Sequence, residues 1–192
     1  MMKYLKLILL AFVVVFATSC KENKKETEAL NETPEETETV ETNTEMTILL
    51  SPKSESTVEG KVTFSQEGDN VLMKATMSGL SEGTHAIHIH EKADCSSADG
   101  KSTGGHWNPT AQPHGKWGAE TGYHKGDIGN FEVGADGLGQ IEMNTTEWCI
   151  GCDDENKDIL GKAIIVHQGT DDFTSQPSGA AGARVSCAGI IQ

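Results

Sequence analysis

Apolar residues recur at every second position over short stretches of this chain, whereas helical periodicity is nearly absent. Successive side chains of a strand point to opposite faces, so each stretch predicts a strand with one face on a core and the other in water. These stretches are 62–64, 71–77, 131–135, 141–143 and 164–166, separated by turn-forming residues at 67–70, 81–83 and 135–137. With a first strand around 47–50 and a last around 184–189, about eight strands are predicted. This number favours an all-β antiparallel sandwich or barrel.

The N-terminus has the pattern of a targeting segment. Lys3 and Lys6 precede an apolar run over 7–17, which is too short to span a bilayer as a helix and is typical of a secretory signal. Small residues then lead to Cys20, and this pattern resembles the cleavage site of bacterial lipoproteins, where the cysteine is lipidated. The pattern predicts a lipoprotein signal peptide over 1–19. A plain signal peptide with an incidental cysteine is the alternative, because the lipoprotein motif usually carries leucine where this chain has Ala17.

Composition divides the mature chain into a tether and one domain. Residues 20–46 are dominated by Glu, Thr, Asn and Lys and cannot bury enough apolar surface to fold, so they are predicted to form a disordered acidic tether behind Cys20. Residues 47–192 suffice for one domain with a sizeable core. We expect an extracytoplasmic protein, lipid-anchored to a bacterial membrane on its periplasmic or cell-surface side.

The formal net charge of the chain is −14. A protein that binds nucleic acid needs cationic side chains to neutralise phosphates, and adsorption to an anionic membrane surface has the same requirement. The charge therefore argues against both kinds of partner.

His88 and His90 lie two positions apart in the alternating stretch 83–90. Their imidazoles share one face of the predicted strand, whereas Ile87 and Ile89 share the other. Two imidazoles on the outer face make half a metal site. His85 has the parity of the isoleucines, so we assign it a structural hydrogen-bonding role.

A third imidazole is predicted on the same side of the sheet. His167 ends a strand on the face opposite Ile164 and Val166, so it could join His88 and His90 around one ion. Most other polar candidates lie in two long connections, 91–127 and 168–183. Connections of this length inside a compact domain are usually functional or disordered.

A second ion could bind within the first connection. His124 and Asp127 are three positions apart and could close on an ion together with His114. Imidazole suits copper and zinc, and three nitrogens with one carboxylate oxygen form a normal tetrahedral zinc shell. A mono-zinc hydrolase would use similar ligands and is an alternative enzyme class.

Six motifs, taken in order, resemble those of the copper,zinc superoxide dismutase family across 47–192. They are GTHAIHIH at 83–90, GGHWNP at 104–109, His114, HKGD at 124–127, VH at 166–167 and GARVSC at 182–187. The resemblance implies a Greek-key β-sandwich with two long functional loops, and copper and zinc as cofactors.

The resemblance also assigns ligands to each metal. It implies copper on His88, His90, His106 and His167, and zinc on His106, His114, His124 and Asp127. His106 would be shared by both metals, and no ligand position is substituted in this chain.

Superoxide is the implied substrate, converted to dioxygen and hydrogen peroxide by redox cycling of copper. His106 would also deliver a proton to the forming peroxide. Arg184 matches the family's active-site arginine, whose planar donors suit a small anion. Asp171 matches the aspartate that accepts a hydrogen bond from one ligand of each metal. The loop 168–183 contains no lysine, which weakens the expectation that this loop steers the anion.

Four cysteines follow Cys20, and an even set in an exported protein suggests disulfides. The resemblance implies a disulfide between Cys95 and Cys187. Cys149 and Cys152 lie outside the family's pattern. With no βαβ context for a thioredoxin-like role, a small local disulfide is favoured over extra metal binding.

A non-catalytic copper-binding or copper-delivery module on the same fold is the alternative from another functional class. A domain that had lost activity would be expected to lack copper ligands or the arginine, and this chain retains both. A homodimer is compatible with the sequence.

Overall fold

The computed structural model describes residues 44–192. The predicted signal peptide, the lipidation of Cys20 and the tether up to residue 43 lie outside the described residues. The folded part begins earlier than the predicted boundary at 47, because the first strand starts at Thr44. Met46 pairs with Phe64 and is buried, so these residues belong to the domain rather than to a tether.

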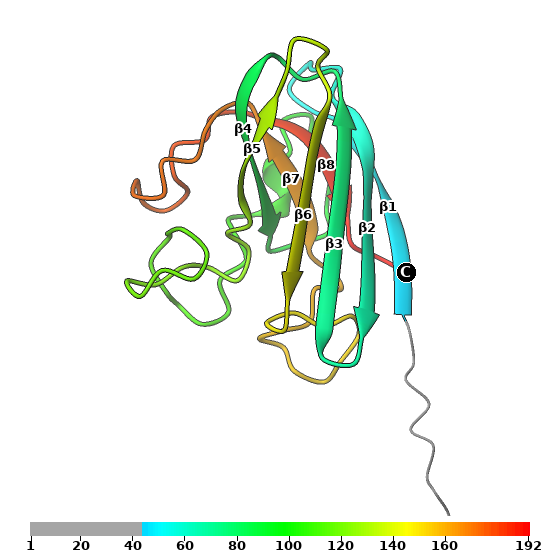
Figure 1. Cartoon of the computed structure of the whole chain (residues 1–192), viewed down its shortest axis with the longest axis vertical. Coiled ribbons are helices and arrows are strands. Elements are labelled where there is room, and N and C mark those ends of the chain that lie inside the picture. Colours follow the sequence, from blue (N-terminus) through cyan, green and yellow to red (C-terminus); the bar gives the residue numbers. More distant parts are fainter. Residues whose placement is uncertain (1–43) are drawn as a thin grey trace, which may run out of the picture. The chain divides into compact units, whose positions relative to one another are not determined.

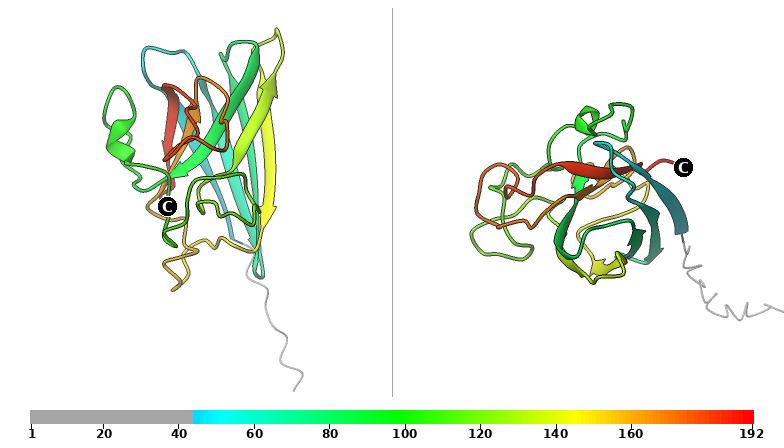
Figure 2. Two further views of the ribbon diagram at one scale, coloured as in Figure 1. Left: turned by 90° about the vertical axis from the view of Figure 1, so that its left-hand side faces the viewer. Right: turned by 90° about the horizontal axis from the view of Figure 1, so that it is seen from above.

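Eight antiparallel strands close into a barrel in the described part of the chain (Figures 1 and 2). They are β1 (Thr44–Pro52), β2 (Glu59–Glu67), β3 (Asn70–Ser78), β4 (Gly83–His90), β5 (Gly129–Val133), β6 (Gly139–Thr145), β7 (Ala163–His167) and β8 (Arg184–Gly189), with one short 3₁₀ helix, η1 (Lys101–Thr103). No helix among these residues is long and apolar enough to cross a membrane.

The strand order is that of a Greek key. Going round the barrel it reads β1-β2-β3-β6-β5-β4-β7-β8. Strands β4, β5 and β6 follow one another as antiparallel neighbours, and β7 returns to pair with β4. This arrangement of three consecutive strands with the fourth beside the first confirms the predicted Greek-key class.

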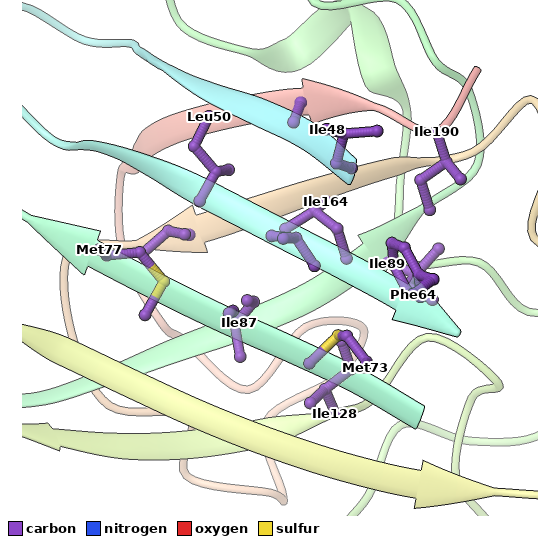
Figure 3. Packing of buried hydrophobic residues seen from close by; sticks show 14 of the residues in the cluster. Ile48, Leu50, Phe64, Met73, Met77, Ile87, Ile89, Ile128, Ile164 and Ile190 are labelled. Atoms are coloured by element: carbon purple, nitrogen blue, oxygen red, sulfur yellow. The ribbon is translucent and has the colours of Figure 1, made fainter. Parts of the chain in front are cut away.

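The alternating residues fill the barrel, as predicted (Figure 3). Val62, Phe64 and Met73 are fully buried. One predicted position differs: β5 ends at Val133, and Ala135 is an exposed residue of the turn to β6. The turn takes over there because Gly137 adopts a positive φ of 71° and Asp136 accepts the Leu138 N–H.

Strands β4 and β7 are buried on both faces, unlike β3, whose outward residues Lys74 and Thr76 are exposed. The isoleucines of β4 belong to the core. The connections after β4 and β7 pack against this strand, since they hydrogen-bond to its backbone at Ile89 and Ala86. Gly126 lets the first connection approach closely, because a Cβ there would lie 2.2 Å from the Ile89 carbonyl oxygen. The Ile89 N–H donates to the Gly126 carbonyl, and the Ile89 carbonyl accepts from Trp107 N–H. These contacts fix the residues next to His106 and Asp127 against β4.

Candidate metal centre

The structure brings the predicted ligands into two buried groups. His88 and His90 come from β4, His167 from the end of β7, and His106 from the connection, where it forms a single antiparallel bridge with His90. Their ligand atoms lie within 4.8 Å of one another. The second group, with ligand atoms equally close, contains His106, His114, His124 and Asp127. His106 therefore belongs to both groups, as the sequence predicted.

Ring nitrogens without a hydrogen-bond partner face both groups. Within the described residues, the unpartnered buried side-chain atoms are His88 Nδ1, His90 Nε2, His106 Nε2, His114 Nδ1, His124 Nδ1 and both ring nitrogens of His167. Leaving a buried polar atom unsatisfied costs about 1–3 kcal/mol. Among these atoms, His114 Nδ1 and His124 Nδ1 lie 3.0 and 3.2 Å from Asp127 oxygens without making a hydrogen bond, so a cluster of this kind requires a further partner. Metal ions satisfy imidazole lone pairs, and these residues fit copper and zinc.

Hydrogen bonds on the opposite ring nitrogens orient the histidines. His88 Nε2 lies 2.8 Å from Asp171 Oδ2, and His90 Nδ1 lies 3.0 Å from the Gly104 carbonyl oxygen. The remaining nitrogen of each ring is left as the lone-pair donor. Such partners fix the tautomer and direction of a ligating imidazole.

Asp127 is the only carboxylate in either group. It accepts the backbone N–H groups of Gly115 and His124, and its oxygens lie 2.8 to 3.2 Å from ring nitrogens of His106, His114 and His124. Burial favours the neutral acid, but the contacts with the three histidines outweigh it and hold the pKa of Asp127 well below its usual range. The carboxylate is thus an anionic ligand at neutral pH.

Most of the imidazoles are held neutral. Burial lowers the pKa of His106 to about 4, and burial lowers the pKa values of His90 and His167 well below the usual value. His114 differs: burial opposes its charge, but contacts with Asp127 and Asp171 raise its pKa to about 9. Neutral imidazole is the ligand form, so a metal ion would have to displace a proton from His114 in order to bind there.

Asp171 connects the two groups from the second long connection. Its Oδ2 accepts from His88 and its Oδ1 lies 2.9 Å from His114 Nε2, which is the geometry expected from the sequence. Asn130 of β5 holds this residue through two backbone bonds, donating to the Asp171 carbonyl at 2.8 Å and accepting its N–H at 2.9 Å. Sequence reasoning missed Asn130, because no motif marks a strand residue that reaches a distant loop.

A cavity of about 550 Å³ opens onto the first group. Its lining includes His90, His106, His167 and Arg184. The Arg184 guanidinium is held by its own hydrogen bonds, donating to the Gly100 carbonyl at 2.9 Å and to Thr103 Oγ1 at 3.0 Å. The predicted arginine therefore lies at the open side of the histidine group, where an anion can reach it.

A second cation at this cavity was missed by sequence reasoning. Lys101 of η1 lines the cavity and forms an exposed ion pair with Asp99 at 3.0 Å. Its position depends on how the connection after β4 folds back beside β8, which no periodic pattern reveals. Lys101 thus brings to the cavity a positive charge that the loop 168–183 does not, next to the carboxylates of Asp99 and Glu91, which also line it.

Both predicted disulfides are present. Cys95 and Cys187 join the connection after β4 to β8 with a Cα–Cα distance of 5.9 Å, and Cys149 pairs with Cys152. His85 lies outside both groups, with Nδ1 3.0 Å from the His167 carbonyl oxygen and Nε2 2.9 Å from that of Ser81. It therefore has the structural role assigned to it.

Comparisons with known proteins agree with this geometry. Residues 58–190 match the family model described as copper/zinc superoxide dismutase. Cu-Zn superoxide dismutase 2 of Mesembryanthemum crystallinum is 37% identical over 141 residues, covering 70% of this chain and 86% of that protein. A Cu-Zn superoxide dismutase of Caulobacter vibrioides is 37% identical over 137 residues, covering 69% and 78%.

Solved structures show the same fold. A double mutant of a SOD-like protein from Bacillus subtilis is 32% identical with a TM-score of 0.68, and the unmutated SOD-like protein is 30% identical with a TM-score of 0.67. Both comparisons cover 76% of this chain and 97% of the other. The likeness therefore spans almost the whole of each solved chain.

Proposed function

The chain belongs to the copper/zinc superoxide dismutase family, and we propose that it converts superoxide to dioxygen and hydrogen peroxide at the two joined ligand groups. The observation that carries this proposal is the position of His106 in both groups. A site for one isolated zinc ion, as in a hydrolase, needs no second group of four histidines that shares a ring with it.

We assign copper to the group of four histidines and zinc to the group that contains Asp127. The chemistry of the donors supports this: the first group offers only nitrogens, and the second adds an oxygen to three nitrogens. Copper supplies one-electron redox chemistry when bound, whereas zinc is redox-inert.

His106 is proposed to move a proton at Nε2, which faces the first group and has no hydrogen-bond partner in the described residues. Two superoxide ions and two protons give one dioxygen and one hydrogen peroxide. The second superoxide ion takes up an electron and needs protons to leave as hydrogen peroxide, and Nε2 is placed to give one. His106 Nδ1 lies on the side of the second group, 2.8 Å from Asp127 Oδ1, and zinc held in that group would keep the ring in place.

Arg184 is proposed to bind the superoxide ion beside the first group. Replacing Arg184 by alanine is expected to lower kcat/KM about 10-fold to 100-fold, the worth of about 1.5–3 kcal/mol for one hydrogen bond to a charged group. Copper content should not change, since Arg184 is in neither ligand group. Stopped-flow dismutation with metal analysis measures both. An Arg184→Lys variant keeps the positive charge but loses the planar guanidinium, which can donate two hydrogen bonds side by side. Full activity in the Arg184→Ala variant would contradict the proposed role of Arg184 in binding superoxide.

Lys101 is expected to attract superoxide over a longer distance. A Lys101→Glu variant should lower kcat/KM about threefold at low ionic strength, because it reverses a charge at the cavity, and the difference should shrink as salt screens it. Lys61 of β2, an exposed lysine that does not line the cavity, gives the matched control Lys61→Glu. If kcat/KM depended on salt equally in the Lys101→Glu and Lys61→Glu variants, the effect would come from the net charge of the protein and not from the position of Lys101.

Lipid anchoring and self-association complete the proposal. We propose that Cys20 carries the lipid and places the domain on the extracytoplasmic side of a bacterial membrane, which is supported by the apolar run and small residues before it. A Cys20→Ser variant should no longer be recovered in the membrane fraction.

We also propose that the protein forms a homodimer. This is supported by the exposed apolar side chains Leu49 and Ile191, which lie near the paired strands β1 and β8. Sedimentation measures the oligomeric state and so tests this proposal.

Dismutation by the metal-loaded protein tests the proposal as a whole. Protein loaded with copper and zinc should remove superoxide catalytically, whereas protein loaded with zinc alone should not. If the fully loaded protein binds both metals but has no activity, the non-catalytic copper-binding or delivery module becomes the better account.

A further inference from the structure

The loop 168–183 binds the backbone of His114 through one side-chain amide. Gln176 Oε1 accepts the His114 N–H at 2.9 Å, and Gln176 Nε2 donates to the His114 carbonyl at 2.9 Å. We propose that Gln176 is a positioning residue that holds His114 in its ligating geometry, so that zinc retention depends on docking of this loop. The inference rests on the zinc assignment in the proposed function.

His114 needs such a support because no strand provides it. It lies between β4 and β5, and η1 is the only regular element between these strands. Among the described residues, Gln176 supplies the only hydrogen bonds to the His114 N–H and carbonyl. The Gln176 amide pairs with the His114 backbone as the backbone of a neighbouring strand would. A side-chain amide can do this because its oxygen accepts one hydrogen bond while its NH₂ group donates another.

The same loop also holds the ring of His114. Asp171 lies 2.9 Å from His114 Nε2, and Gly179 packs so closely that a Cβ there would lie 1.7 Å from Asp171 Oδ1 and 2.7 Å from His114 Nε2. Asp171 orients the ring but leaves the backbone free. Gln176 fixes the backbone from which the ring projects, so the two contacts are complementary.

Zinc release is the direct measurement of this role. We expect a Gln176→Ala variant, loaded with copper and zinc, to lose zinc to a chromogenic chelator about tenfold faster than the unmodified protein. This factor is at the low end of the effects that follow when a residue hydrogen-bonded to a metal ligand is removed. Copper content should be unchanged, because His114 is not in the four-histidine group. Gln140→Ala removes the same amide from an exposed position on β6 and should release zinc at the original rate.

Hydrogen exchange of the His114 amide in the same loaded samples separates positioning from general loosening. This amide should exchange faster in Gln176→Ala, while amides of the barrel strands keep their protection. Unchanged exchange at His114, or faster exchange there with unchanged zinc release, would overturn the inference. If the unmodified protein binds no zinc at all, the zinc assignment fails first, and that result is distinct from either outcome.

Discussion

A His167→Ala variant is expected to lose copper and to dismute superoxide no faster than background. His167 supplies one of four imidazoles to the first group from the rigid end of β7, and its ring nitrogens have no hydrogen-bond partner in the described residues. Alanine leaves three nitrogens with an open position. Copper content by mass spectrometry and activity by stopped flow should fall together.

The matched control is His124→Ala, which removes an imidazole from the other group. It should release zinc while leaving the four histidines of the first group complete. Normal turnover in the His167→Ala variant would contradict the assignment of copper to the first group. Loss of zinc rather than copper from this variant would contradict it as well.

The second large effect is expected on stability. Replacing Cys95 and Cys187 together by serine should lower the free energy of unfolding by about 4–5 kcal/mol, because this disulfide closes a sequence separation of 92 residues and restricts the unfolded chain. Denaturant titration of the metal-free proteins measures the difference without a contribution from metal binding.

The other disulfide provides an internal comparison. Cys149 and Cys152 are only three residues apart, so the same chain-entropy argument gives about 2 kcal/mol for their double serine variant. Only the Cys95–Cys187 variant should also lower activity, since that disulfide holds the connection whose Gly100 and Thr103 bind Arg184. Equal losses of stability in the two variants would contradict the loop-closure account.

The barrel and the strand-borne ligands were predictable because they follow a period of two. His88 and His90 share a face in any extended conformation, so their convergence needed no knowledge of the fold. The same parity separated His85 from them. The alternation failed at the end of one element, because Ala135 belongs to a turn, and composition failed at the first strand, which already includes Thr44.

The loop-borne contacts were not predictable in the same way. Asn130 and Gln176 act across 41 and 62 residues of sequence, and Lys101 lies in η1, whose Thr103 bonds to Arg184 across 81 residues. Such contacts depend on how two irregular connections fold over β4 and β7, and irregular backbone carries no periodic signal. Motif resemblance located the ligands in these loops and also Asp171, but it did not reveal Asn130 and Gln176, which hold the backbones of Asp171 and His114.

Anomalous diffraction at the copper and zinc absorption edges, from crystals of the protein loaded with both metals, tests the central claim most directly. The account predicts a copper peak among His88, His90, His106 and His167 and a zinc peak among His106, His114, His124 and Asp127. Copper in the group that contains Asp127, or one metal alone filling both groups in a fully active sample, would contradict it.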